Sequence, residues 1–115
     1  IFEGTSKQYR INVQGKELQI PLRDILYFET GRHVTLIHTL TDTISITKVL
    51  SEVCEDFEQN PEFLKVGRSY LINRLYVRNV DPAEIEMMNS AVIPIPVRLQ
   101  REIRQQLKED RFSKT

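Results

Sequence analysis

The sequence predicts a mostly β domain, in which small antiparallel sheets are accompanied by one or two short helices. Short runs rich in aromatic and β-branched residues follow one another along most of the chain, and segments typical of turns separate them. Only the segments 47–59 and 97–108 repeat apolar residues at helical spacing. The length of 115 residues and the hydrophobic content of 40% fit one globular domain.

The first half of the chain is expected to form β-hairpins. Tyr9, Ile11 and Val13 alternate with polar neighbours, which is typical of a strand with one buried face. The pairs Gln-Gly at 14–15 and Thr-Asp at 41–42 have the composition of tight turns. The strands predicted in this half are 9–13, 16–22, 24–29, 33–40 and 43–46.

Two helices and a second set of strands complete the expected fold. The apolar face of the first helix, over 47–59, consists of Val49, Leu50, Val53, Cys54 and Phe57. Thr47 is placed to cap the start of this helix, and the Asn-Pro pair at 60–61 ends it. The second helix, over 97–108, carries a stripe of Leu99, Ile103 and Leu107. The strands predicted in this half are 63–66, 69–72, 75–80, 85–88 and 91–95.

The charges are balanced in total but separated along the chain. Sixteen basic and 16 acidic residues give a formal net charge of zero. However, the segment 51–62 contains acidic residues and no base, whereas 63–80 contains bases and no acid. The neutral total therefore conceals one acidic and one basic surface.

We expect no membrane span, because the longest apolar run, 91–97, is interrupted by Pro94 and Pro96. No signal peptide is recognisable either. The first residue is Ile1 rather than methionine, which suggests that the chain is the C-terminal part of a longer protein.

The residues that could carry enzyme or metal chemistry have simpler interpretations. Cys54 lies on the apolar face of the first helix, where the acidic neighbours Glu55 and Asp56 would raise its pKa, so we interpret it as a structural cysteine. His33 and His38 are five positions apart, and a strand would direct them to opposite faces, which disfavours a metal site. We expect neither an enzyme nor a cofactor, because the glycines are scattered and no carboxylate pair is apparent.

The segment 63–73 is the most informative part of the chain. Gly67-Arg68-Ser69 lies between two apolar runs, so the bend is expected to expose Arg68. An arginine side chain offers a planar set of donors that suits a phosphate or the edge of guanine. A strand pair with a solvated basic edge would produce the same pattern without any ligand.

Several motifs of the sequence, in order, resemble the LytTR family of bacterial DNA-binding domains. The segment 63–73 resembles the family signature Phe-Leu-x-x-x-Arg-Ser-x-x-x-Asn. The segment 20–29, Ile-Pro-Leu-Arg-Asp-Ile-Leu-Tyr-Phe-Glu, resembles the opening block, and 34–36 with 41–42 resembles the next hairpin. The helix after Thr47 corresponds to the short helix of the family, and 95–98 resembles the closing block. The resemblance covers about residues 7–107, which we take as the core of a single domain spanning 1–115.

The resemblance implies that loops, rather than a recognition helix, enter successive major grooves of double-stranded DNA. By position, the residues that would contact bases are His33, Arg68 and Arg98. On charge and proximity, the residues that would contact phosphates are Arg32, Lys65, Ser69, Asn73, Arg74 and Arg101.

The chain departs from the family pattern at three places. Gly67 stands where the family commonly has histidine, and Asn-Ser at 89–90 replaces the usual Asn-Gly turn. In the closing block arginine follows valine directly, which leaves open whether Arg98 or Arg101 reads bases.

The functional hypothesis is sequence-specific binding of double-stranded DNA in transcription regulation. The chain would be the cytoplasmic output domain of a two-component response regulator, with a receiver or another regulatory domain upstream. Alone it would be a monomer, and the full regulator would bind DNA as a dimer. The alternatives are a small β module that binds a protein or peptide through a strand edge, and an enzyme that uses Cys54 or His33.

Overall fold

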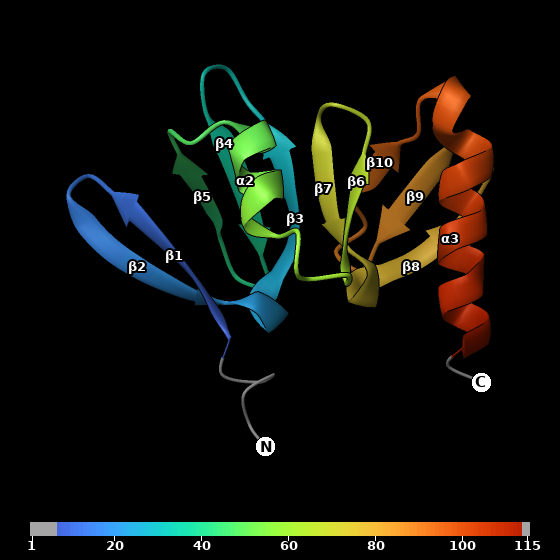
Figure 1. Ribbon diagram of the computed structural model, residues 1–115, viewed down its shortest axis with the longest axis horizontal. Coiled ribbons are helices and arrows are strands. Elements are labelled where there is room, and N and C mark those ends of the chain that lie inside the picture. The colour runs from blue at the N-terminus through green and yellow to red at the C-terminus, as the bar shows by residue number, and fades with distance from the viewer. Residues whose placement is uncertain (1–6, 114–115) are drawn as a thin grey trace.

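The computed structural model describes residues 7–113, and the side chains as far as Lys108. It is mostly β, as the sequence predicts (Figure 1). The strands are β1 (Gln8–Val13), β2 (Lys16–Pro21), β3 (Ile25–Thr30), β4 (Thr35–Thr39), β5 (Thr43–Ile46), β6 (Phe63–Val66), β7 (Tyr70–Asn73), β8 (Val77–Val80), β9 (Glu84–Met87) and β10 (Val92–Pro94). The helices are α2 (Leu50–Asp56) and α3 (Gln100–Ser113), with the 3-10 turns η1 (Leu22–Asp24), η2 (Arg74–Tyr76) and η3 (Val97–Leu99). In this part of the chain, no helix has the length and apolar character of a membrane span.

The strands form three antiparallel sheets. β1 and β2 make a separate hairpin, whose turn at Gln14 and Gly15 has positive φ at both residues (53° and 82°). This is the backbone that a two-residue hairpin turn requires, and it confirms the predicted turn. The central sheet has the order β5-β4-β3-β7-β6, and a third sheet has the order β10-β9-β8.

The central sheet is covered on both faces, and a hydrophobic cluster lies on each. The first cluster joins the sheet to α2 and to the β1–β2 hairpin through Phe28, Ile37, Leu50, Val53, Phe57, Leu71, Tyr9 and Ile11. The second joins the opposite face to the third sheet and to α3 through Tyr27, Ile72, Ile85, Met87, Ile93, Ile103 and Leu107. Tyr27 and Phe28 belong to different clusters, because neighbouring strand residues point to opposite faces.

The first helix is shorter than predicted. α2 begins at Leu50, and its N-cap is Val49, which has an extended backbone and no capping side chain. Thr47 is therefore not the cap. The hydroxyl of Thr35 donates to the carbonyl of Lys48 at 2.6 Å, which holds the chain against β4 after β5 ends. Because of this contact, the helix begins at Leu50, later than the local pattern suggested.

The boundaries also differ in the second half. The predicted strand 75–80 starts with the turn η2, and only Val77–Val80 is strand. The predicted helix 97–108 opens with η3, and α3 then runs from Gln100 to Ser113. The Asn-Ser turn at 89–90 is present, and Ser90 adopts a positive φ of 73°, a backbone conformation that favours glycine.

Candidate nucleic-acid interface

Three connecting segments lie at one end of the molecule. They are the β3–β4 loop (31–34), the β6–β7 turn (67–69) and the segment from β10 into η3 (95–99), and all three are at the top of Figure 1. We call these residues the three-loop edge. Each segment contributes one of the residues predicted to contact bases, namely His33, Arg68 and Arg98.

The β3–β4 loop is closed by its own backbone. The amide of Gly31 donates to the carbonyl of Val34 at 2.8 Å. A Cβ at Gly31 would lie 2.8 Å from Cγ2 of Val34, so a larger residue here would have to displace the Val34 side chain. His33 has a φ of 62° and, like Arg32, is exposed. The loop therefore holds Arg32 and His33 outside the packed sheet.

The first loop is tied to the second by hydrogen bonds. The amide of Thr30 donates to the carbonyl of Ser69 at 2.9 Å. The hydroxyl of Thr30 donates to the carbonyl of Arg68 at 3.4 Å. Because both acceptors are backbone atoms, the side chains of Arg68 and Ser69 stay exposed and available to a ligand.

The second loop packs against the third. Gly67 has a φ of 67°, and a Cβ there would lie 2.9 Å from Cγ of Pro96. A residue with a side chain would thus have to adopt an unfavourable backbone and displace Pro96. This close approach favours glycine at position 67. The sequence alone did not single out Pro96, although the prolines on both sides of Ile95 were a signal of a rigid segment.

The third segment is anchored to the body of the domain. Ile95 is 4% exposed, and its amide donates to the carbonyl of Ala83 at 2.8 Å. The side-chain amide of Gln100 donates to the carbonyl of Ile95 at 3.1 Å. Arg98 follows in η3 and is exposed. The arginine is therefore presented from a fixed backbone.

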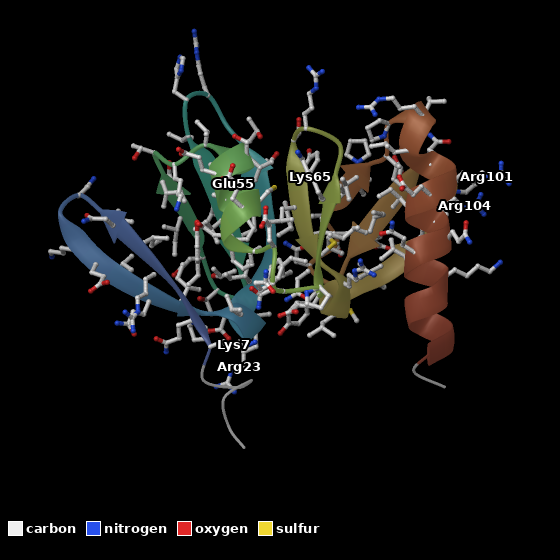
Figure 2. The ribbon with its side chains drawn as sticks, in the orientation of Figure 1. Lys7, Arg23, Glu55, Lys65, Arg101 and Arg104 are labelled. Atoms are coloured by element: carbon white, nitrogen blue, oxygen red, sulfur yellow. The ribbon has the colours of Figure 1, made fainter. Side chains whose placement is uncertain are left out.

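The three-loop edge is basic, although the whole chain is neutral. Its segments contain Arg32, Arg68, Arg98 and His33, and they contain no Asp or Glu. Two further predicted residues flank the edge, Lys65 on β6 and Arg101 in the first turn of α3, and both are exposed. In Figure 2 Arg101 projects from the outer side of α3, whereas Lys7 and Arg23 lie at the opposite end of the molecule.

Two predicted phosphate contacts are not part of this edge. Asn73 is 1% exposed; its side chain donates to the carbonyl of Ile25 at 2.9 Å and accepts from the amide of Leu75 at 3.0 Å. The burial and backbone hydrogen bonds of Asn73 favour a structural role over the predicted phosphate contact. Arg74 lies in η2, which β7 separates from the turn that carries Arg68.

His38 and Cys54, the other candidate site residues, are both partly buried within the domain. Nε2 of His38 lies 2.7 Å from a carboxylate oxygen of Glu29, and the imidazole stacks on Tyr27 with ring centroids 4.2 Å apart. Cys54 is half-buried, and burial raises its pKa while Lys65 acts in the opposite direction. Among the described residues, no group of three His, Cys, Asp or Glu is placed to hold a metal ion.

The acidic segment forms the exposed side of α2, which packs on the central sheet through the first hydrophobic cluster. Glu52, Glu55 and Asp56 are exposed on α2, which covers the central sheet (Figure 2). Asp56 accepts a hydrogen bond from Tyr9 at 2.7 Å and pairs with Lys48 at 2.6 Å. Burial and this hydrogen bond raise the pKa of Tyr9.

The sequence also matches a known family of domains. The family model of the LytTr DNA-binding domain matches residues 15–108. The chain belongs to the LytTR family. The match includes all three segments of the edge.

A solved structure has the same fold. It is described as the LytTr DNA-binding domain of a methyl-accepting/DNA response regulator from Bacillus cereus, and it is 17% identical in sequence with a TM-score of 0.74. The similarity covers 89% of this LytTR chain and 97% of the Bacillus chain. No curated protein matches the sequence.

Proposed function

We propose that this LytTR domain binds double-stranded DNA sequence-specifically through the three-loop edge, and that it thereby regulates transcription. The observation that carries the proposal is the connection between the loops. Thr30 is hydrogen-bonded to Ser69, and Gly67 lies close to Pro96. The three basic segments are therefore held in one arrangement before DNA binds. Membership of a family of DNA-binding domains supports the same function.

Within this proposal, the exposed cations divide into two groups. Arg68 and Arg98 would each present two donors to guanine in the major groove, and His33 would make a single hydrogen bond. Arg32, Lys65, Ser69 and Arg101 would contact phosphates, which fix the position of the domain but carry no sequence information.

The proposed biological setting is a two-component response regulator of the cytoplasm. A receiver or another regulatory domain upstream of this chain would control access to DNA. The similar Bacillus cereus structure is described as part of a response regulator, which supports this setting.

Two measurements test the proposal. The chain is first used to select duplexes from a random-sequence pool, and an enriched motif is expected. Affinity for the selected duplex is then measured against salt concentration. If Arg32, Lys65 and Arg101 displace counterions from three phosphates, log K should fall with log salt at a slope of about −3.

The alternative, a β module that binds a peptide through a strand edge, gives different results. Selection would enrich no motif, and duplex binding would be absent. Either outcome would contradict the proposal.

A further inference from the structure

Val97 is the most exposed of the large hydrophobic side chains in the described part of the chain. This residue is 84% exposed, whereas the other exposed large hydrophobic residues are 38% to 56% exposed. Contact between this side chain and an apolar group of a ligand would remove apolar surface from water and would therefore be favourable.

The backbone around Val97 is rigid. Pro94 and Pro96 restrict the chain on its N-terminal side, and the buried Ile95 anchors it. On the C-terminal side, the amide of Leu99 donates to the carbonyl of Pro96 at 2.9 Å. Val97 is thus presented at a fixed position and would lose little conformational entropy on binding.

Val97 is a neighbour of both proposed base-contacting arginines, of Arg98 in the chain and of Arg68 in the fold. It precedes Arg98 in η3, and it lines a shallow hollow of about 280 Å³ together with Arg68, Pro94, Pro96 and other residues of the two segments. The hollow is open to solvent and mainly apolar, and one cation, Arg68, lines it and would attract DNA to this surface. A small apolar group of the DNA would fit here.

We infer that Val97 reads the 5-methyl group of a thymine in the major groove, adjacent to the bases that Arg68 and Arg98 contact. The thymine methyl is the apolar feature that the major groove displays, and it distinguishes thymine from cytosine. Val97 would therefore be a specificity-determining residue. The inference rests on the proposed function.

The experiment uses the duplex that the chain selects from a random pool. Each thymine is replaced in turn by deoxyuridine, which lacks only the methyl group. At one or two positions, wild-type affinity should fall about fourfold, the loss expected for one apolar carbon returned to water. Val97→Ala should bind the unmodified duplex more weakly by a similar factor, and the deoxyuridine effect at those positions should disappear.

The matched control is Val92→Ala. Val92 is 51% exposed, but it borders a hollow lined by Asp81, Glu84 and Glu86, where DNA should not approach. This variant should keep the full deoxyuridine effect. Circular dichroism would verify that both variants fold.

The outcomes separate the two proposals. An enriched motif whose binding is insensitive to deoxyuridine at every thymine would overturn the inference alone. So would a deoxyuridine effect that persists in Val97→Ala. If Val97→Ala changed only the cooperativity between two sites, the side chain would contact a protein instead. Failure to bind any duplex would overturn both the inference and the proposed function.

Discussion

Arg68 and Arg98 should make the largest single contributions to recognition. Replacing either with alanine removes up to two charge-assisted hydrogen bonds, which should cost about 1–3 kcal/mol on the selected duplex. His33→Ala should cost less, because a neutral imidazole makes one such bond. Fluorescence anisotropy titrations measure these affinities.

Arg23 provides the matched control for these variants. It is exposed and lies at the end of the molecule opposite the three-loop edge (Figure 2). Arg23→Ala should therefore bind like the wild type. If Arg68→Ala, Arg98→Ala and His33→Ala all retained wild-type affinity, the assignment of base contacts would be wrong.

Asn73 should act on stability rather than on DNA binding. Asn73→Ala would leave the carbonyl of Ile25 and the amide of Leu75 without their side-chain partners. The free energy of unfolding should fall by about 1–3 kcal/mol, as measured by urea denaturation. The folded variant should bind DNA normally, and a specific loss of affinity at unchanged stability would restore Asn73 to the interface.

At the scale of the elements, α2 packs on the central sheet through the first hydrophobic cluster. Val53 is 0% exposed, so Val53→Asp would bury an unpaired charge and should largely unfold the domain. The neighbouring Glu55 is exposed, and Glu55→Ala should change the unfolding free energy little. Thermal denaturation distinguishes the two variants.

Cys54→Ser tests the remaining role of this helix. Because the cysteine is half-buried and burial raises its pKa, the thiol is poorly suited to act as a nucleophile. The serine variant should bind DNA with a modest loss of stability. A folded variant without DNA binding would instead indicate a redox role.

Local patterns were sufficient to locate most elements, because strands and turns depend on neighbouring residues. The strand β5 and the turn at Gln14 are examples. The hairpin pairs could be predicted, but the pairing of β3 with the distant β7 could not. β3 contains Ile25, Leu26, Tyr27 and Phe28, all buried, since both faces of the central sheet are covered and a bulge shifts its register with β4. Most of the elements that cover the two faces are distant from β3 in the sequence, so the local pattern does not reveal them.

The same limit applies to the site. The exposure of Arg68 could be predicted from the glycine and serine beside it. The hydrogen bond from Thr30 to Ser69 could not be predicted, because it joins backbone groups of two segments that only the sheet brings together. The burial of Asn73 could not be predicted either. Its polar side chain suggested an exposed residue, but it satisfies buried backbone groups at the end of β7.

For the whole molecule, size and charge determine how it would occupy DNA. The longest dimension is 41 Å, slightly more than one turn of duplex, which is about 34–36 Å. One domain can therefore cover a single half-site and would bind it weakly. A regulator that holds two copies of the domain would gain affinity through effective concentration.

The chain alone should be a monomer in solution. The exposed carboxylates of α2 would repel a second copy of that face, and the same holds for Arg101, Arg104 and Lys108 on α3. Sedimentation of the free chain should therefore show one species with the mass of a monomer, 13.5 kDa. Titration onto duplexes with one and with two half-sites should give the same affinity per site, because the element that links two copies would lie outside this domain. A stable dimer without DNA, or strong cooperativity between half-sites, would show instead that the domain carries its own dimer interface.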